Sequence, residues 1–273
     1  MNPSSTPPSP QVKAVLVTGA AKRLGREIAL QFARQGWDVA VHYGRSTPEA
    51  NQTVEEIQAF GVRAQAFHAD LASDTATKSL FLAVSQAFPN LACLVNSASI
   101  FEYDRANSST PLSGKNLQEH MQVNLTAPIL LSQLMFEHQK NKASASKAIP
   151  AVIPAVIQLL DQKLINLNPD YLSYTLSKAA LLSSVELLAM DFAPYLRVVG
   201  LAPGISLPSG DQTDDGFSKA HKMTPLGKSS TPADIAKAAV FLAESGAITG
   251  TTLYVDGGQH LLPSSRDVMF KTN

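Results

Sequence analysis

Apolar and polar positions follow two alternating patterns along the chain. Short runs rich in Val, Leu and Ile recur, separated by longer segments whose apolar residues repeat at helical spacing. Because these runs are too short for helices, we interpret them as buried strands. The predicted strands lie at residues 14–18, 38–43, 63–68, 91–96, 155–160, 197–201 and 252–255. The predicted helices lie at residues 24–35, 48–60, 74–87, 116–138, 171–192 and 232–244.

Repeated alternation of strand and helix predicts the fold class. We expect an α/β fold, a Rossmann-type doubly wound parallel sheet of about seven strands with helices on both faces. Such sheets bind ligands beyond the carboxyl ends of their strands. The residues that follow each predicted strand are therefore the first candidates for a functional site.

Two stretches interrupt the alternation. Residues 139–154 are polar, rich in Lys, Ser and Ala, and contain two prolines, so we expect a surface loop there. Residues 203–230 are rich in Gly, Pro, Ser and Asp and follow a strand end. This second stretch is either a lid over the substrate or an ordinary loop.

Composition narrows the organisation and the partners. A chain of 273 residues with 45% apolar content predicts a single domain at residues 12–262, with a tail at 263–273. Residues 1–11 are Pro/Ser-rich and lack an apolar core, which predicts a disordered extension and not a secretory signal. The 22 basic and 22 acidic residues favour a small-molecule partner over nucleic acid or a membrane surface.

Two further features bear on location and chemistry. The most apolar long stretch, residues 148–160, is too short and too rich in proline to span a membrane, so a cytoplasmic location is predicted. The single cysteine, Cys93, excludes an intramolecular disulfide and a multi-cysteine metal site, and its apolar surroundings predict a buried core position. We expect no bound metal.

A candidate nucleotide loop follows the first predicted strand. Residues 18–25 read TGAAKRLG and open the first predicted helix. Glycines let the backbone approach a pyrophosphate, and the helix amino end presents unpaired N–H groups to it. Alone, such a loop is more often a structural turn, but its place between strand and helix favours dinucleotide binding. The cofactor contacts expected here are Gly19, Lys22, Arg23, Leu24 and Gly25.

The end of the second predicted strand favours NADPH over NADH. The residues are His42, Tyr43, Gly44, Arg45 and Ser46, with no carboxylate to bind a ribose 2′-hydroxyl. The guanidinium of Arg45 and the hydroxyl of Ser46 suit a 2′-phosphate instead. The alternative is a solvated loop arginine.

Residues after the third and fourth strands are further candidates for cofactor contacts. Asp70, followed by Leu71, is placed either to accept a hydrogen bond from the adenine amino group or to cap the next helix. Small residues at Asn96, Ser97 and Ala98 let the backbone pass close to a ribose, although their composition alone indicates only a turn.

Tyr174 and Lys178 are the candidate catalytic pair. They lie four residues apart and therefore on one face of a helix. A nearby ammonium stabilises phenolate, so we expect the pKa of Tyr174 to fall toward the working pH, where it can exchange protons with a substrate. A solvated helix face is the alternative, but the position after the fifth strand favours catalysis.

These motifs together resemble the short-chain dehydrogenase/reductase family over residues 12–258. The matching residues are Thr18, Gly19, Gly25, Asn96, Ser97, Ala98, Ser99, Asn124, Tyr174, Lys178, Pro203 and Gly204. The resemblance implies that Lys178 also holds the nicotinamide ribose and that Asn124 shares a proton relay with Lys178. It places Pro203, Gly204 and Ser206 beside the nicotinamide. Arg23 stands where the family's middle glycine lies, so its side chain must point outward to cofactor phosphate or substrate.

One departure from that family is informative. Thirteen residues before Tyr174, where the family places a serine that donates to a substrate carbonyl, this chain has Asp161. An ionised aspartate only accepts hydrogen bonds and repels a developing oxyanion. It suits a ring with N–H groups, and it can orient Tyr174 or relay a proton, with its pKa raised by partial burial. The alternative is an aspartate that caps a turn.

Within the larger family, the chain resembles pteridine reductases and bacterial dihydromonapterin reductases. The shared residues are those of 18–26, His42, Tyr43, Arg45, Ser46, Ser99, Ile100, Phe101, Asp161, Tyr174, Lys178 and 203–206. This resemblance implies that Phe101 stacks on a pterin and that Ser99 and Arg23 contact pterin and cofactor phosphate. Without it, Phe101 is interpreted as a core residue. Gly44, Ser97 and the tail at 259–273 depart from the pattern.

The sequence therefore predicts an NADPH-dependent reductase of a C=N bond in a dihydropterin, biopterin or dihydrofolate. A carbonyl or 3-oxoacyl reductase of the same family is the alternative enzyme. A nonenzymatic NADPH-binding sensor is the alternative outside enzymes, and the intact set of Tyr174, Lys178 and Asn124 argues against it. The family implies a homotetramer. Wide apolar faces on the helices at 116–138 and 171–192 agree with subunit packing or with an intramolecular core.

Overall fold

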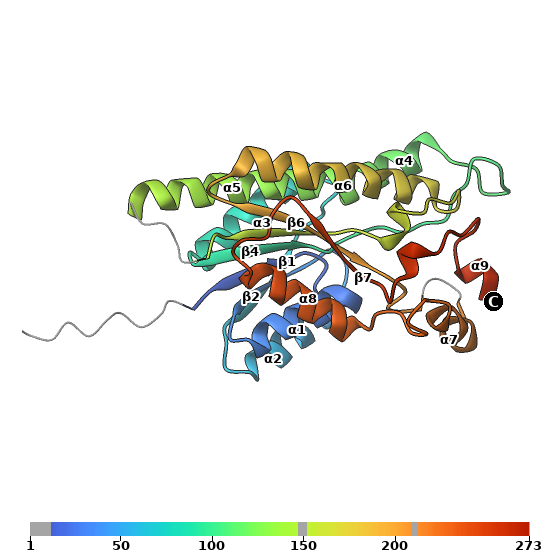
Figure 1. Ribbon diagram of the computed structural model, residues 1–273. Coiled ribbons are helices and arrows are strands. Elements are labelled where there is room, and N and C mark those ends of the chain that lie inside the picture. Colours follow the sequence, from blue (N-terminus) through green and yellow to red (C-terminus); the bar gives the residue numbers. More distant parts are fainter. Residues whose placement is uncertain (1–11, 147–151, 209–211, 273) are drawn as a thin grey trace, which may run out of the picture.

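The computed structural model describes residues 12–146, 152–208 and 212–272. The extension predicted at residues 1–11 lies outside the described residues, as does part of the loop predicted at 139–154. The described chain forms a sheet flanked by helices, with the C-terminal end of the chain beside one end of the sheet (Figure 1).

The sheet has seven parallel strands in the order β3-β2-β1-β4-β5-β6-β7. This confirms the predicted α/β class and the doubly wound topology. Strand order reverses between β1 and β4, which is where such sheets open a crevice for a ligand. The strands are β1 (Ala14–Val17), β2 (Asp38–Tyr43), β3 (Ala64–His68), β4 (Leu91–Asn96), β5 (Ala155–Leu159), β6 (Arg197–Pro203) and β7 (Thr252–Val255).

Helices cover both faces of the sheet, as Figure 1 shows. One apolar core lies under α1, α2 and α8, and a second lies under α3, α5 and α6. The inner strands β1, β4, β5 and β6 are buried at nearly every position, which is why their sequences are mostly apolar. The helices are α1 (Arg23–Arg34), α2 (Thr47–Gln58), α3 (Asp74–Ala87), α4 (Gly114–Met121), α5 (Ala127–Ser146), α6 (Leu172–Phe192), α7 (Asp214–Lys222), α8 (Pro232–Glu244) and α9 (Met269–Thr272).

The prediction of one continuous helix ending at residue 138 was wrong. A π-helical turn, Gln122–Thr126, separates α4 from α5, and α5 continues to Ser146. The surface loop predicted at 139–154 is therefore helical over its first half. Its first proline is Pro150, and the preceding Lys, Gln and Ala residues favour helix.

Two side chains of this extension fasten it to the sheet. Gln139 donates a hydrogen bond to the carbonyl of Leu91 at 2.7 Å, and Lys142 donates to the carbonyl of Pro89 at 3.0 Å. These tertiary bonds explain why the polar composition did not produce a loop.

The stretch at 203–230 contains a helix, α7, in addition to loop. Thr213 caps it by accepting a hydrogen bond from the Gly216 N–H, and acidic and basic residues occupy its first and last turns respectively, as the helix dipole favours. The tail likewise folds, into α9, which lies beside α7 (Figure 1).

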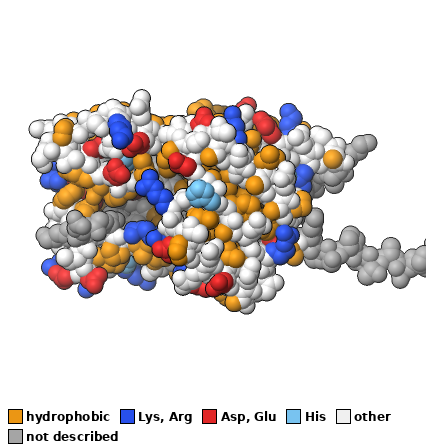
Figure 2. All heavy atoms as spheres, turned by 180° about the vertical axis from the view of Figure 1, so that it is seen from behind, with side chains coloured by type: hydrophobic (Ala, Val, Ile, Leu, Met, Phe, Trp, Pro, Cys, Tyr) orange, Lys and Arg blue, Asp and Glu red, His pale blue; other side chains and the backbone are white. Residues whose placement is uncertain are grey.

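Two properties of the described residues, 12–146, 152–208 and 212–272, bear on partners. None of the helices there is both long and apolar enough to cross a membrane. No group of three or more His, Cys, Asp or Glu side chains there is arranged to hold a metal ion. Basic and acidic side chains are interspersed on the face shown in Figure 2. Cys93 is fully buried, as predicted.

Candidate active site

A cavity of about 1230 Å³ opens at the carboxyl ends of the strands. The residues that follow β1 to β6 line it, together with the C-terminal segment, by which we mean residues 263–272. Most residues predicted for the site meet here. They are Gly19, Lys22, Arg23, Leu24, Gly25, His42, Arg45, Asp70, Leu71, Ser97, Ala98, Ser99, Phe101, Asp161, Tyr174, Lys178, Pro203, Gly204 and Ser206.

The nucleotide loop has the close backbone packing that a dinucleotide cradle needs. Gly19 has φ +65°, and a Cβ atom there would lie 2.9 Å from the Ala98 Cα. A Cβ on Gly25 would lie 2.3 Å from the carbonyl oxygen of Gly19. Lys22, the N-cap of α1, makes no side-chain hydrogen bond to the first turn. The helix amino end is thus left to a ligand, and the residues fit a pyrophosphate.

This packing predicts a specific effect for Gly25→Ala. The added methyl group meets backbone that cannot move aside, so we expect about 1–3 kcal/mol of lost stability and weaker NADPH binding. Thermal unfolding and a fluorescence titration with NADPH measure the two effects. Gly114→Ala is the control, because a Cβ atom there meets nothing within 4 Å. Equal behaviour of the two variants would contradict the cradle.

Arg23 adopts a left-handed backbone conformation, with φ +55°. That conformation is the one glycine favours, which explains why the resemblance places a glycine at this position. Its side chain points outward, as predicted, and donates to the carbonyl of Pro208 at 2.9 Å. Arg23 therefore links the nucleotide loop to the segment that follows β6.

The imidazole of His42 bonds to the backbone of the nucleotide loop. Its Nδ1 accepts a hydrogen bond from the Gly19 N–H at 3.1 Å, and its Nε2 lies 3.1 Å from the carbonyl oxygen of Ala69. Together these contacts require a neutral ring with its proton on Nε2. Burial lowers the pKa of His42 from 6.5 to about 4. Both ring nitrogens are occupied, so His42 shapes the cofactor site through the loop.

The lowered pKa of His42 predicts a pH dependence of stability. Between about pH 6.5 and 4 the unfolded chain binds a proton at His42 that the folded chain does not. The free energy of unfolding should therefore fall as pH decreases through this window, by up to about 3 kcal/mol. Urea unfolding at pH 7 and pH 4.5 measures it. His42→Gln should flatten this dependence, and an unchanged slope in that variant would refute the assignment.

The predicted 2′-phosphate contacts are only partly at the cavity. Arg45 lies at its edge and is exposed, whereas Tyr43 and Ser46 are not among the lining residues. Tyr43 packs against His68, with ring centroids 5.4 Å apart. Lys22 reaches the cavity but also forms an ion pair of 2.7 Å with Glu49.

Asp70 makes a local turn. Its Oδ1 accepts a hydrogen bond from the Ala72 N–H at 2.9 Å. The helix-capping alternative was wrong, because the side chain of Ser73 caps α3 by accepting from the Ala76 N–H. The exposed Asp70 carboxylate lines the cavity and keeps acceptor capacity for an adenine amino group.

Asn96 lies behind the cavity. It is buried and donates to Gln158 Oε1 at 3.0 Å, which joins β4 to β5. Thr18, which we did not predict as a contact, holds in place the cavity-lining residues that follow β4. Its Oγ1 accepts hydrogen bonds of 3.0 Å from the N–H groups of both Ser97 and Ala98.

A hydrogen bond joins Tyr174 and Asp161, the candidate acid/base pair of the cavity. The phenol donates to Asp161 Oδ2 at 3.0 Å, and the Lys163 N–H donates to Asp161 Oδ1 at 2.8 Å. Burial raises the pKa of Asp161, as predicted. Burial and the neighbouring carboxylate raise the pKa of Tyr174 well above 10. The predicted lowering of that pKa was wrong, because burial and the Asp161 carboxylate both disfavour the charged phenolate.

The ammonium of Lys178 bonds to the backbone at the end of β5. It donates to the carbonyl of Leu159 at 2.7 Å and lies 5.9 Å from the Tyr174 ring centroid. Burial lowers the pKa of Lys178 to about 8. Lys178 lines the cavity one helical turn after Tyr174 along α6, and its contact with a ribose stays a prediction.

Asn124 lies in the π-helical turn and outside the cavity lining. Its Nδ2 donates to Ser177 Oγ at 3.1 Å, and its Oδ1 accepts from the N–H of Ile100 at 2.9 Å and from the hydroxyl of Ser99. These contacts connect the β4 end to α6. The relay predicted between Asn124 and Lys178 stays a prediction.

Phe101 stands at the cavity and is 40% exposed, so it is no core residue. One face stacks on Tyr171, with centroids 4.0 Å apart and planes 16° from parallel. Its ring also meets Tyr174 edge-on at 4.7 Å. Tyr171 thus fixes the orientation of Phe101. No sequence pattern indicated this packing, because it depends on a left-handed backbone at Tyr171.

The structure adds residues that we did not predict. Lys163 and the C-terminal segment line the cavity beside Asp161. Lys163 follows Asp161 by two positions, which was a weak signal. The contacts of Arg266 and Asp267 with Asp170 join positions 96 and 97 residues apart, and no local pattern indicates them.

Comparisons with known proteins agree with this geometry. A family model described as enoyl-(acyl carrier protein) reductase matches residues 19–260. The 3beta-hydroxysteroid dehydrogenase 1 of Eggerthella lenta is 32% identical, covering 92% of this chain and 95% of that one. A 3-oxoacyl-[acyl-carrier-protein] reductase FabG of Staphylococcus epidermidis is 30% identical, covering 91% and 99%.

A solved structure is similar over nearly the whole chain. The FolM alternative dihydrofolate reductase 1 of Brucella canis, complexed with NADP, superposes with a TM-score of 0.82. It is 33% identical, and the match covers 93% of this chain and 96% of that one. The relatives thus include proteins named for carbonyl substrates and one named for dihydrofolate.

Proposed function

The chain belongs to the short-chain dehydrogenase/reductase family, and from this premise we propose that it is an NADPH-dependent reductase of a pterin C=N bond. Its substrate class is a dihydropterin, biopterin or dihydrofolate. Family membership makes the chain an oxidoreductase. The choice of substrate rests on the site.

The cofactor proposed is NADP(H). The packed glycines, the uncapped helix amino end and Arg45 at the cavity edge fit a dinucleotide with a 2′-phosphate. The similar Brucella canis structure is complexed with NADP, which supports this choice. When bound, NADPH supplies the hydride. Lys178 lines the cavity and would hold the ribose, and Pro203 and Gly204 line the wall expected beside the nicotinamide.

Asp161 carries the proposal. At the position where carbonyl reductases of the family place a donor, this chain holds a carboxyl group that already accepts from Tyr174 and from the Lys163 N–H. A pterin offers N–H and amino groups to such an acceptor, whereas a ketone offers none.

The proton route follows from the same contacts. Tyr174 remains protonated because its pKa lies well above 10, so its hydroxyl can donate a proton to a ring nitrogen as hydride reaches the adjacent carbon. Asp161, whose pKa burial raises, lies 3.0 Å from that hydroxyl and replaces the proton when it is itself protonated. One hydride and one proton thus saturate one C=N bond.

Phe101 supplies the platform for a flat ring. One of its faces is taken by Tyr171, and its exposed part lies at the cavity. A pterin between Phe101 and the nicotinamide would be stacked on both sides, an arrangement that a flat heterocycle favours. Ser99 and Arg23 line the same cavity and support the predicted pterin and phosphate contacts.

A carbonyl or 3-oxoacyl reductase is the second candidate. The Eggerthella lenta and Staphylococcus epidermidis relatives, named for steroid and 3-oxoacyl substrates, support it. A protonated Asp161 would also supply a donor to a carbonyl oxygen. A nonenzymatic sensor is disfavoured, because a binding protein has no need of the Tyr174 to Asp161 contact.

NADPH oxidation with a substrate panel tests the proposal. The panel contains dihydromonapterin, dihydrobiopterin, dihydrofolate, simple ketones and a 3-oxoacyl thioester. We expect turnover of at least one pterin or folate with kcat/KM well above that for ketones. Turnover of ketones or the thioester alone would overturn the pterin proposal, and NADPH binding without any turnover would favour the sensor.

Arg45 tests the cofactor choice. Replacing it with Ala should raise the KM for NADPH by about 10- to 100-fold, the loss of one charge-assisted hydrogen bond to the 2′-phosphate. The KM for NADH should stay within about twofold, since NADH lacks that phosphate. Arg34→Ala is the control, because Arg34 pairs with Glu27 on α1. Equal losses for NADPH and NADH would contradict the assignment.

We also propose the homotetramer that the family resemblance implies, in the cytoplasm. The second half of α6 exposes Leu187 and Met190 at 60% and 65%, with Leu176 nearer its start at 42%. Large apolar side chains on one helix suit burial by another subunit. Sedimentation velocity distinguishes a tetramer from a monomer.

A further inference from the structure

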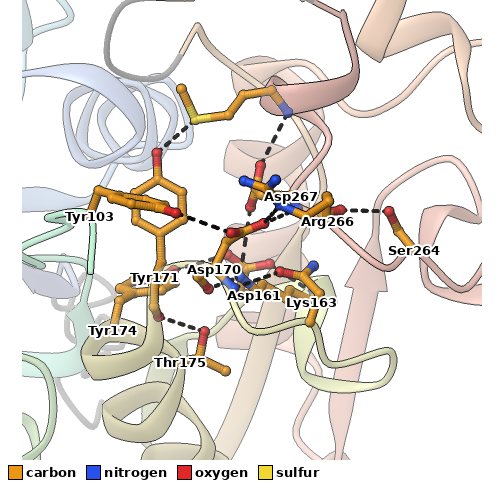
Figure 3. Close-up of polar contacts among 12 residues, drawn as sticks. Tyr103, Asp161, Lys163, Asp170, Tyr171, Tyr174, Thr175, Ser264, Arg266 and Asp267 are labelled. Carbon is orange, nitrogen blue, oxygen red and sulfur yellow. Dashed lines mark hydrogen bonds and ion pairs between the residues drawn. The ribbon is translucent and has the colours of Figure 1, made fainter. Parts of the chain in front are cut away.

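Asp170 fastens the C-terminal segment to the substrate side of the cavity. Its carboxyl group is fully buried, and its Oδ2 accepts from Arg266 Nε and from the Asp267 N–H, both at 2.8 Å. Its Oδ1 accepts from the hydroxyl of Tyr103 at 3.3 Å and from Arg105 at 3.4 Å. Figure 3 shows the contacts of Tyr103, Arg266 and Asp267 with Asp170, beside Asp161 and Tyr174.

Lys163 lies between this cluster and the acid/base pair. It is only 5% exposed, and its ammonium donates to the carbonyl of Asp170. Asp267 Oδ2 lies 3.7 Å from the ammonium, and the Tyr171 ring centroid lies 5.6 Å from it. The backbone N–H of Lys163 holds Asp161 Oδ1. A buried ammonium is costly unless it is paired, and the C-terminal segment supplies the paired carboxylate.

We propose that Lys163 is a positioning residue that orients Asp161 and sets the charge balance of the Asp161 and Tyr174 pair, and that the C-terminal segment holds its ammonium in place through Asp267. The inference relies on the proposed function only in using an acid/base step at Tyr174. It gives the tail, which departs from the family pattern, a role in its own subunit's site.

The charges that face the pair decide the direction of the effect. Asp161 is faced by Lys163 from the turn after β5, by Tyr174 and Lys178 from α6, and by Asp267 from the C-terminal segment. Lys163 lowers the pKa of Asp161, while burial and Asp267 raise it. Asp267 also raises the pKa of Tyr174. The two residues of the Lys163 and Asp267 pair thus act on the acid/base pair in opposite directions.

Opposite charges predict opposite shifts of one pH profile. Proton delivery needs the protonated pair, so activity is lost as pH rises through its apparent pKa. Lys163→Met removes a cation and should move this basic limb of kcat to higher pH by roughly one unit. Asp267→Asn removes an anion and should move it to lower pH. A residue that only packs would lower activity equally at every pH.

The experiment measures kcat and KM between pH 5 and 10 for Lys163→Met, Lys163→Arg, Asp267→Asn and the exposed control Lys115→Met. Lys163→Arg keeps the positive charge, so we expect its basic limb to lie at the wild-type pH. We expect Lys163→Met and Asp267→Asn to change kcat more than the KM for NADPH. NADPH titration and thermal unfolding verify folding. If Lys163→Met does not fold, Lys163→Arg and Asp267→Asn still decide.

A limb that stays in place in Asp267→Asn and Lys163→Met, or that moves the same way in both, overturns the proposal. A basic limb that is displaced from the wild-type pH in Lys163→Arg also overturns the proposal. The profiles use whichever substrate the wild-type chain reduces. If the wild-type chain reduced a ketone but no pterin, the proposed function would be overturned. The role of Lys163 could still be tested with the ketone.

Discussion

Tyr174→Phe is expected to lower kcat by roughly 10²- to 10⁴-fold, the usual contribution of a positioned acid/base group. The change removes one hydroxyl, the donor 3.0 Å from Asp161 Oδ2, and leaves the ring in its contact with Phe101. NADPH affinity should change little, because Lys178 and the nucleotide loop are untouched. Steady-state rates and an NADPH titration measure the two quantities.

A matched substitution elsewhere separates chemistry from folding. Tyr195→Phe removes the same atom beyond the end of α6, away from the cavity lining, and should leave kcat unchanged. If Tyr174→Phe kept more than about a tenth of wild-type kcat, proton delivery would have to come from another group.

Asp161→Ser is expected to change which substrate is reduced. Serine restores the hydroxyl donor that carbonyl reductases of the family have at this position, and it removes the acceptor for a pterin N–H. We expect kcat/KM for the dihydropterin to fall by at least about 10²-fold, while reduction of a ketone or 3-oxoacyl substrate is spared or improved. The ratio of the two kcat/KM values is the quantity to report.

An aspartate remote from the site provides the control for this switch. Asp191→Ser, at an exposed position near the end of α6, should leave both kcat/KM values unchanged. Equal losses for pterin and ketone in Asp161→Ser would mean that the carboxyl group supports the site without choosing the substrate. An unchanged pterin rate would show that the acceptor is not used.

The fold was predictable because its signal is local and repeated. The strands buried on both faces are mostly apolar, and α3 and α8 lay at the predicted residues, 74–87 and 232–244. The extension of α5 to Ser146 was not predictable from pattern, because it depends on bonds from Gln139 and Lys142 to the end of a strand and the loop before it.

The site was predictable where reactive side chains follow a predicted strand closely in the sequence. Asp161 and Tyr174 were placed in the sequence by their spacing, and the structure brings them into contact. The charge balance was not predictable, because burial and the Asp161 carboxylate raise the pKa of Tyr174. Nor were the contacts of the C-terminal segment, since Asp170 and Arg266 meet only after the whole chain has folded.

Deuterium transfer from [4,4-²H₂]NADPH to a dihydropterin tests the central claim most directly. The geometry predicts that hydride passes to the carbon of the C=N bond while nitrogen takes the proton of Tyr174. Mass spectrometry should find one deuterium per molecule of tetrahydropterin on the carbon of the reduced bond, with one NADPH oxidised for each. No deuterium in any pterin or folate, alongside deuterated alcohol from a ketone, would contradict the account.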